Sequence, residues 1–476
     1  MDKSKIFKAH PIMLFSFMRP FLFVLIIPFI TAAVQYIKKG QVSGFFTLEA
    51  ITLSLITVIS LARTFSFSLT VEKKYILVKS GIFLKKTARI PKKRISCVTV
   101  RRNIADIIFK SATYELNTEA GSDEKTDLSF KLKLKDSYRL SNMLYIQKNF
   151  RSESFSPLKI ALLSASSSSL ITGVLVGAPV INLAGRLLGL SVAELLLDRI
   201  SKIASAFSRY LPPTINIITT VVVLIYGISF ANALLKNTRF RLKNGETEVE
   251  VDSGLAVRNC TIFSKKDVNC LILEQTPLMH LFKAFTLSVA VGGYKILKGK
   301  KPVVIPCEKE ERITSIRKKL FPYLNEESDN VTALYSVRDK SRFAFVPVLF
   351  YLLILAVVIT VGVLFNEFFY LALFLGFVAA VINTYYLYIS LFECKKGRLA
   401  IGDNILLAFG LKGTKVNMLL CQKENVAEIK MCQTPADRRH STCKLKIVVR
   451  GEGSERIRVR NLDYNDTLQL IKKNFE

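Results

Sequence analysis

Histidine is scarce in this sequence of 476 residues, and cysteine is scattered. The chain has only His10, His280 and His440, and its eight cysteines include no Cys-x-x-Cys pair. Zinc sites need clustered ligands, so we expect no metal, and isolated cysteines predict no disulfide framework. The sequence also has no Gly-rich phosphate loop, no paired carboxylates at a pocket and no nucleophile beside a base. It therefore predicts no enzyme and no cofactor.

Acidic residues are also few. Only 37 Asp and Glu stand against 68 Lys and Arg, so the formal net charge is +31, yet half of the residues are hydrophobic. A nucleic-acid-binding protein would explain the charge but not the hydrophobicity, and aromatic residues are not interleaved with the basic ones as base stacking requires. A membrane protein with large cytoplasmic parts explains both, because anionic lipids and the positive-inside bias favour Lys and Arg.

One segment, residues 81–110, returns further along the chain. It matches residues 254–283 without a gap, so that Gly81 aligns with Gly254 and Cys97 with Cys270. A third, looser copy starts at Gly410. Such a repeat indicates one structural unit used three times. Free cysteine is a common small core residue, so we expect the two aligned cysteines to be buried.

Six apolar runs are each long enough to cross a bilayer as a helix, and we interpret them as three hairpins. They cover residues 12–36, 44–62, 158–182, 214–235, 343–365 and 368–392. Arg19, Glu49 and Glu367 lie near span ends, where charged side chains reach the head groups. We expect no cleavable signal peptide, because the first run is long and a second follows at once.

After each hairpin the hydrophobic period changes to two, which is typical of strands. We expect hairpins in residues 1–64, 153–236 and 342–393, β domains in 65–152, 237–323 and 394–476, and a linker in 324–341. Each β domain ends in a helix. The outward segments hold few Lys and Arg, so the positive-inside rule places both termini and all three β domains in the cytoplasm.

Residues 187–210, inside the second hairpin, have the spacing of an amphipathic helix on the outer surface. Its apolar face carries Leu188, Val192, Leu196, Ile200, Ile203 and Phe207. This face is a candidate external contact. The alternative is a helix that rests on the outer leaflet without a partner, and the sequence leaves both open.

Several motifs carry a resemblance to a known family. They are His10-Pro11, Ile90-Pro91, Arg94-Ile95, Asn117-Thr118-Glu119-Ala120-Gly121 and Ser156-Pro157. With the order of hairpins and β domains, they resemble the bacterial pleckstrin-homology type 2 (YdbS/YdbT-like) multi-pass membrane proteins, in a three-repeat form that covers essentially the whole chain. Where that family usually has a glycine after a short apolar turn, this chain has Lys110, Lys283 and Ser441.

The resemblance implies a mixed α/β membrane protein. Six transmembrane helices would form three hairpins, each followed by a cytoplasmic PH-like β domain of about seven strands with a C-terminal helix. It also implies a smaller one-hairpin relative as a hetero-oligomer partner, and it does not imply an enzyme.

A basic cluster in the first β domain is the strongest candidate site. It comprises Lys85, Lys86, Arg89, Lys92, Lys93, Arg94, Arg101 and Arg102. Near an anionic membrane each such residue contributes about 1 kcal/mol of attraction, so the cluster is a candidate anionic-lipid contact. The second copy repeats the charge only at Arg258, Lys265 and Lys266, which favours the alternative of a solvated, positive-inside flank.

The function we expect is that of a non-catalytic bacterial cell-membrane protein. Its PH-like domains would bind protein or lipid as assembly platforms at the inner leaflet, for example in envelope protection. The expected partners are membrane lipids and the smaller relative, but no nucleic acid. The alternative is a transporter or exporter component for a membrane-active peptide or lipid. The shortage of ionisable residues within the spans speaks against it.

Overall fold

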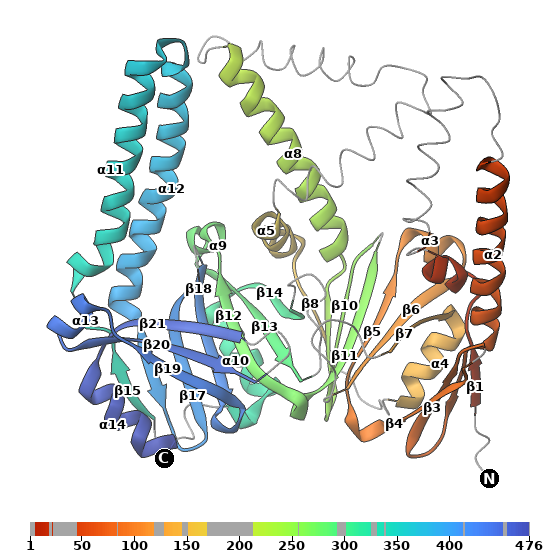
Figure 1. The fold of residues 1–476 in the computed structure, drawn as a ribbon. Helices are drawn as coiled ribbons and strands as arrows, with labels where there is room; N and C mark the ends of the chain where they lie inside the picture. The colour runs from red at the N-terminus through yellow and green to blue at the C-terminus, as the bar shows by residue number, and fades with distance from the viewer. Residues whose placement is uncertain are drawn as a thin grey trace.

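The structure is a computed structural model of the chain. It describes residues 5–18, 21, 45–82, 84–118, 128–144, 151–168, 213–255, 257–292, 301–324, 331–337, 339–412, 415–450 and 455–475. The predicted outer helix 187–210 and most of the predicted spans 12–36 and 158–182 lie outside these residues. Figure 1 shows a row of β domains from which the helices rise on one side. The N- and C-terminal ends of the chain both lie at the opposite side of this row.

The first β domain takes strands from both sides of the first hairpin. β1 (Lys5–Lys8) pairs antiparallel with β2 (Ser68–Val71), which follows α2 (Phe45–Ser66). The other elements are β3 (Tyr75–Ser80), β4 (Lys86–Pro91), η1 (Lys92–Arg94), β5 (Ile95–Arg102), α3 (Ile104–Ile108), β6 (Ser111–Thr118), β7 (Leu128–Lys133) and α4 (Leu134–Leu144). Because β1 and β2 pair, the chain enters and leaves the hairpin at neighbouring points.

The second and third β domains repeat this order of elements. The second has β8 (Arg151–Ser154), α5 (Pro157–Ser167), α8 (Pro213–Asn237), β9 (Arg241–Asn244), β10 (Glu248–Ser253), β11 (Arg258–Ser264), η2 (Lys265–Asp267), β12 (Val268–Gln275), α9 (Pro277–Leu281), β13 (Ala284–Val291), β14 (Val303–Lys309), α10 (Glu310–Leu320) and η3 (Pro322–Leu324). The third has β15 (Thr332–Tyr335), α11 (Lys340–Leu364), η5 (Asn366–Phe368), α12 (Phe369–Lys396), β16 (Arg398–Ile401), β17 (Ile405–Lys412), β18 (Lys415–Gln422), η6 (Lys423–Asn425), β19 (Val426–Cys432), α13 (Pro435–Arg439), β20 (Thr442–Val449), β21 (Glu455–Asp463) and α14 (Tyr464–Phe475).

The strand before each hairpin changes the predicted domain boundaries. The sequence places residues 324–341 in a linker, but β15 lies there and pairs with β16 on the other side of the third hairpin. Four residues are too few to show an alternating pattern, and the pairing partner lies more than 60 residues away. With these strands included, each domain has seven described strands and a closing helix, as the resemblance implies.

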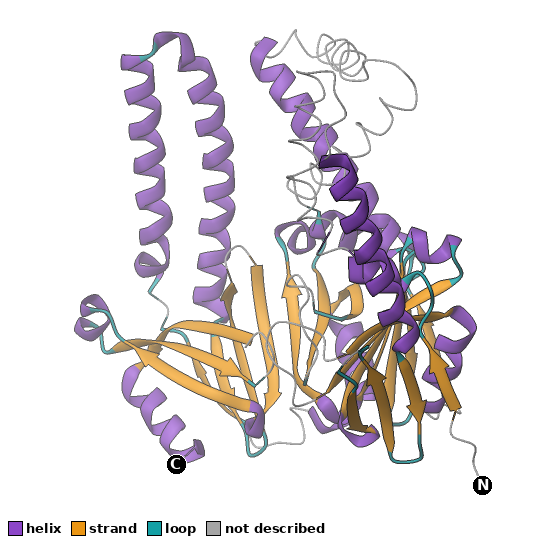
Figure 2. Ribbon diagram, turned by 45° about the vertical axis from the view of Figure 1, so that its right-hand side comes forward, coloured by secondary structure: helices purple, strands orange, loops and turns teal. Residues whose placement is uncertain are grey.

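Sheets continue from one β domain into the next. In the first, second and third domains alike, four strands form one sheet and three form another. β5 of the first domain pairs with β11 of the second, and β12 of the second pairs with β18 of the third. Two seven-stranded sheets result, in the orders β7-β6-β5-β11-β10-β9-β8 and β14-β13-β12-β18-β17-β16-β15. Figure 2 shows the strands gathered below the long helices. The strands β4 and β19, which correspond to the junction strands, pair only with β3 and β20 among the described strands, so each has a free edge at one end of the row.

Two of the three aligned glycines lie in the turn between two strands of their domain. Gly81 and Gly254 have φ of 111° and 102°, the left-handed region that favours glycine. Gly410, where the third copy starts in the sequence alignment, instead lies inside β17 opposite Asn417. A Cβ atom at Gly410 would lie 2.0 Å from the carbonyl oxygen of Arg458. The sequence alignment of Gly410 with the turn is therefore wrong, since this glycine is required by the close approach of β21.

The turns after α3, α9 and α13 share one backbone conformation. Lys110, Lys283 and Ser441 have φ of 51°, 50° and 50°. This left-handed conformation is the one that glycine adopts most readily. The turn therefore has the same backbone in all three domains, although none of the three residues is glycine.

Three described helices are long and apolar enough to cross a membrane. They are Thr220–Asn237 within α8, Lys340–Leu364 and Phe369–Lys396. A shorter apolar helix, Ile51–Ser66, lies within α2. Large side chains on these helices point outward, as Val223 and Phe377 do with 62% and 66% of their surface exposed. Such exposure suits helices that lipid surrounds.

Candidate membrane interface and domain junctions

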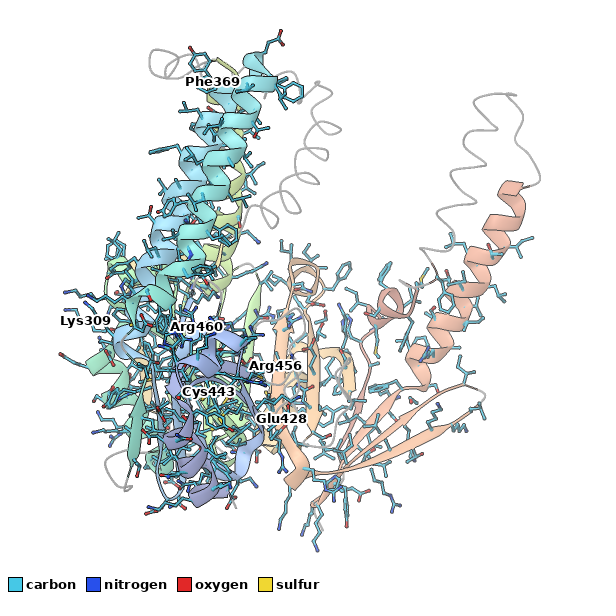
Figure 3. The ribbon with its side chains drawn as sticks, turned by 60° about the vertical axis from the view of Figure 1, so that its left-hand side comes forward. Lys309, Phe369, Glu428, Cys443, Arg456 and Arg460 are labelled. Atoms are coloured by element: carbon cyan, nitrogen blue, oxygen red, sulfur yellow. The ribbon has the colours of Figure 1, made fainter. Side chains whose placement is uncertain are left out.

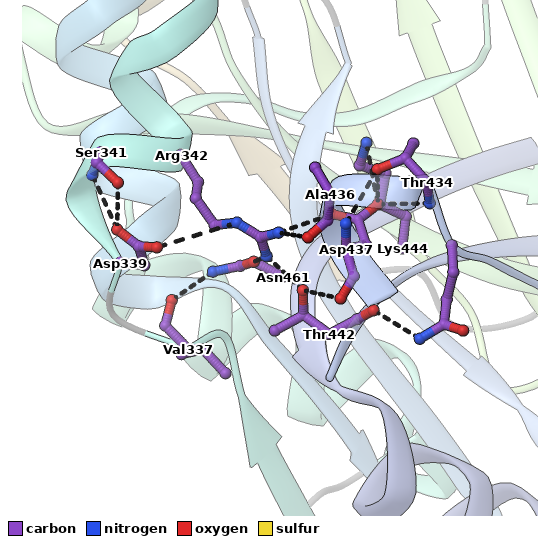
Figure 4. A network of polar contacts seen from close by, with 11 residues as sticks. Val337, Asp339, Ser341, Arg342, Thr434, Ala436, Asp437, Thr442, Lys444 and Asn461 are labelled. Carbon is purple, nitrogen blue, oxygen red and sulfur yellow. Dashed lines mark hydrogen bonds and ion pairs between the residues drawn. The ribbon is translucent and has the colours of Figure 1, made fainter. Parts of the chain in front are cut away.

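Polar contacts fix the base of the third hairpin to the third β domain. Arg342, in the first turn of α11, donates to Asn461 Oδ1 at 2.7 Å and to the Ala436 carbonyl oxygen at 2.6 Å (Figure 4). Arg460 Nε of β21 donates to Oε2 of the fully buried Glu393 of α12 at 2.7 Å. Losing one partner of a buried ion pair costs about 3–5 kcal/mol. We therefore expect this hairpin and its domain to move as one unit.

The second hairpin is attached differently. Lys159 Nζ of α5 lies 2.5 Å from Oε1 of Glu308, which is buried in β14. Leu163 of α5 packs against Met279 of α9 and Cys307 of β14. This apolar contact holds α5 against the short helix of the second domain.

The first domain has an ion pair where the second has this apolar contact. Asp106 of α3, in the place of Met279, is fully buried and lies 2.7 Å from Lys131 Nζ. Burial alone would raise the pKa of Asp106, but the Lys131 and Ser111 donors lower it below its usual value. The short helices thus share a backbone but differ in how they are held.

The two junctions between β domains have the same register. Cys97, the third residue of β5, lies opposite Phe263, the penultimate residue of β11. Cys270, the third residue of β12, lies opposite Cys421, the penultimate residue of β18. An antiparallel register fixes which side chains face which core, so the junctions are two copies of one interface.

Side chains cross each junction in both directions. Cys97 and Cys270 are fully buried in the cores of the following domains, which confirms their predicted packing role. In return Ile262 enters the core of the first domain, and Leu420 that of the second. Because each core is completed by its neighbour, separating two domains would expose apolar side chains on both.

The predicted lipid-contact cluster does not form one patch. The Ser66 hydroxyl, at the end of α2, donates to the Gly81 carbonyl oxygen, so the β3–β4 turn lies at the helix side of the domain. Lys85 and Lys86 follow this turn, whereas residues 92–94 follow the far end of β4, roughly 20 Å away at 3.3 Å per residue. Arg89 lies exposed between them. Lys92, Lys93 and Arg94 are therefore too far from the helices to share a lipid site with Lys85.

Arg101 and Arg102 lie at the opposite edge of the first domain, at the helix-side end of β5. Arg101 Nε donates to Asn259 Oδ1 of β11 at 3.2 Å, across the first junction. Arg102 lines a pocket of about 390 Å³. Its Nε is buried and has no hydrogen-bond partner among the residues that the structure describes.

Three further arginines from the second domain line this pocket, which we call the arginine pocket. They are Arg239, Arg241 and Arg258. Arg258 forms a two-pronged ion pair with the buried Asp252, with Nε–Oδ1 at 3.0 Å and Nη2–Oδ2 at 2.5 Å. Sequence analysis missed Arg239 and Arg241. Their position directly after a predicted span was the available signal, but no local pattern pairs them with Arg102.

The second junction has a pocket at the corresponding place with different chemistry. It encloses about 1320 Å³, and its lining includes Gln275, His280, Tyr388, Phe392 and Lys396. His280 lies between Gln275 Oε1, at 2.8 Å, and the Tyr388 hydroxyl, at 3.2 Å. Burial and the nearby Lys396 charge lower the pKa of His280 below its ordinary value. The second pocket therefore combines aromatic and charged side chains, and Gln275 stands at the position that Arg102 holds at the first junction.

Comparison with protein families decides the classification. A family model described as bacterial PH domain matches residues 21–146 and 180–322, more than half of the chain. The chain belongs to the bacterial PH domain family. Apart from β1 and β8, the matches cover the strands of the first two PH-like domains and parts of their hairpins, while the third PH-like domain repeats the strand order outside the matched residues. No curated protein matches the chain.

Proposed function

We propose that this chain is a non-catalytic scaffold of the bacterial cell membrane. Three PH-like domains would form one rigid platform at the cytoplasmic face, beneath six spans in three hairpins. The observation that carries this proposal is the identical register of the two domain junctions. Domains that act independently are usually joined by exposed linkers with few contacts between them. Here the sheets themselves are continuous.

The attachments of the hairpins support the same proposal. Arg342 and Arg460 hold the third hairpin, and Lys159 holds the second. A partner bound at one domain would therefore be held at a set distance and orientation relative to the others. The platform would recruit membrane lipids and a smaller relative of the same family.

Hydrogen–deuterium exchange of the full chain in detergent micelles tests the rigidity. Amides of β5, β11, β12 and β18 that bond across the junctions should exchange as slowly as amides bonded within a domain, because both kinds of pair are buried. The exposed edges β4 and β19 serve as the internal control. Junction amides that exchange as fast as those of β4 would show domains that separate, and would overturn the platform.

Two further measurements test the partner and the alternative function. Purification from the host in mild detergent should yield a stoichiometric complex with a one-hairpin relative, and the chain alone in every preparation would contradict that partnership.

Flux of a membrane-active peptide in proteoliposomes should be absent. Flux that depends on the protein would support the exporter instead.

A further inference from the structure

The arginine pocket concentrates positive charge that the described residues do not neutralise. Arg102, Arg239, Arg241 and Arg258 surround it, and Asp252 is the acidic residue in its lining. Because Asp252 is already paired with Arg258, the other three arginines line the pocket without an ion pair among the residues that the structure describes. Like charges so close together repel, so an anion that binds between them lowers the electrostatic energy of the site.

The pocket lies at the level where α8 leaves the membrane. Arg239 follows the end of the candidate span Thr220–Asn237 by two residues. The β10–β11 turn is bonded to the same helix end, since Gly254 N donates to the Thr238 carbonyl oxygen at 2.7 Å and Leu255 N to that of Leu235 at 2.9 Å. The arginines are therefore at the depth of lipid head groups.

The rim of the pocket is apolar. Ile107 of α3 and Leu255 of the β10–β11 turn belong to its lining, and they are 41% and 47% exposed. Ile104 and Ile108, elsewhere on α3, are 62% and 69% exposed. Exposing such an apolar surface to water costs free energy, whereas lipid acyl chains would cover it. A pocket lined by arginines together with exposed apolar side chains fits a molecule that has both a charged group and hydrocarbon.

We propose that the arginine pocket binds the phosphate of an anionic phospholipid from the leaflet next to the PH-like domains. Guanidinium groups match phosphate oxygens in two-pronged geometry, which suits arginine better than lysine for this role. The volume of about 390 Å³ admits a phosphate with its glycerol but not a whole lipid, so the acyl chains would lie over Ile107 and Leu255. The inference rests on the proposed function only for the position of the membrane.

The absence of tryptophan from the chain provides a direct test. The substitution Ile107→Trp places a single fluorophore at the rim, and Ile108→Trp places the matched control one residue away on the same helix. Each variant of the full chain is reconstituted in vesicles of equal phosphatidylglycerol and phosphatidylcholine, with one of the two lipids brominated near the glycerol. At Ile107→Trp, brominated phosphatidylglycerol should quench about five-fold more than brominated phosphatidylcholine, as about 1 kcal/mol of selectivity requires. At Ile108→Trp the two should quench nearly equally.

A charge control separates the pocket from general surface attraction. Adding Arg102→Gln and Arg239→Gln to the rim probe should bring the quenching ratio close to one, whereas adding Lys85→Gln and Lys86→Gln should leave it unchanged. Equal quenching by both lipids in the rim probe would overturn the proposal. Loss of the quenching selectivity in the variant with Lys85→Gln and Lys86→Gln would also overturn it. So would loss of the selectivity on adding millimolar inorganic phosphate, which would identify free phosphate as the ligand. Exchange at the junction amides is measured on the same samples, so that failure of the platform is seen separately.

Discussion

The same strand edges are paired in the middle of the molecule and free at its ends. At the junctions, the positions that reach into the neighbouring core hold Cys97, Cys270, Ile262 and Leu420, all buried. At the free edges the corresponding positions hold charged residues, Glu428 on β19 (Figure 3) and Arg89 on β4, both exposed.

The backbone alone therefore does not determine which edges pair. Each edge offers the same hydrogen-bonding groups, so the side chains must allow or prevent the addition of another strand. A charged residue that points toward the partner is a known protection of sheet edges, because pairing would bury it. Glu428 and Arg89 therefore mark where the row of domains ends, at three.

The largest effect should follow from giving a junction the residue of a free edge. Leu420→Arg would bury an uncompensated charge in the core of the second domain, at a cost of about 3–5 kcal/mol. Exchange of the β12 and β18 amides measures this as a lower free energy of opening. Leu420→Met is the matched control and should cost less than about 1.5 kcal/mol. Equal exchange in the two variants would show that Leu420 does not decide the pairing.

The converse change should open the ends of the row. With Arg89→Ile and Glu428→Val together, β19 of one molecule can pair with β4 of the next in the junction register, so we expect head-to-tail association. Light scattering of the detergent-solubilised protein measures the mass per particle. Either single variant keeps one charged edge and should remain at the wild-type mass. A double variant with the wild-type mass would show that other features block these edges.

A smaller effect is expected at the polar contact across the first junction. Arg101→Ala removes the hydrogen bond to Asn259 and should weaken the junction by about 1 kcal/mol. Arg101 also lies 3.8 Å from Glu115, whose pKa burial raises although Arg101 lowers it. Without Arg101 the pKa of Glu115 rises further.

The pH dependence of that variant has a definite sign. A carboxyl group with a raised pKa binds its proton more readily in the folded state, so stability is lost as pH rises from about 4.3 through the folded pKa. The loss caused by Arg101→Ala should therefore be greatest at neutral pH and shrink on acidification toward pH of about 4.3. Measured junction exchange with no such trend would exclude Glu115 as the responsible group.

The smallest effect is expected from an exposed ion pair across the second junction. Lys415 Nζ lies 3.6 Å from Glu274, and the two side chains are 46% and 23% exposed. Water and salt screen such pairs, so Lys415→Ala should change the free energy of opening by no more than about 0.5 kcal/mol. If the free energy of opening fell by more than about 1 kcal/mol in the same exchange measurement, charged pairs rather than buried side chains would stabilise the junction.

Local patterns made much of the fold predictable. The change from long apolar runs to period-two segments separates hairpins from β domains, and the repeat of residues 81–110 identifies the unit. The strands before the hairpins were missed, because their partners lie beyond a hairpin. The candidate site was less predictable. Residues 85–94 are contiguous in sequence but spread along a strand, while Arg102 and Arg239 are distant in sequence and line one pocket.

The number of units, the chemistry of the hairpins and the apolar positions within each domain follow from spacing along the chain and can be recognised in the sequence. Which strand edges join, and which residues meet at the membrane side, depends on contacts between residues that are distant in sequence. Every unit has the same edges, and the choice between them depends on the side chain that each presents to its neighbour. The small buried side chains of Cys97 and Cys270 allow neighbouring domains to pair, whereas the charged side chains of Arg89 and Glu428 stand at the free edges where the row ends.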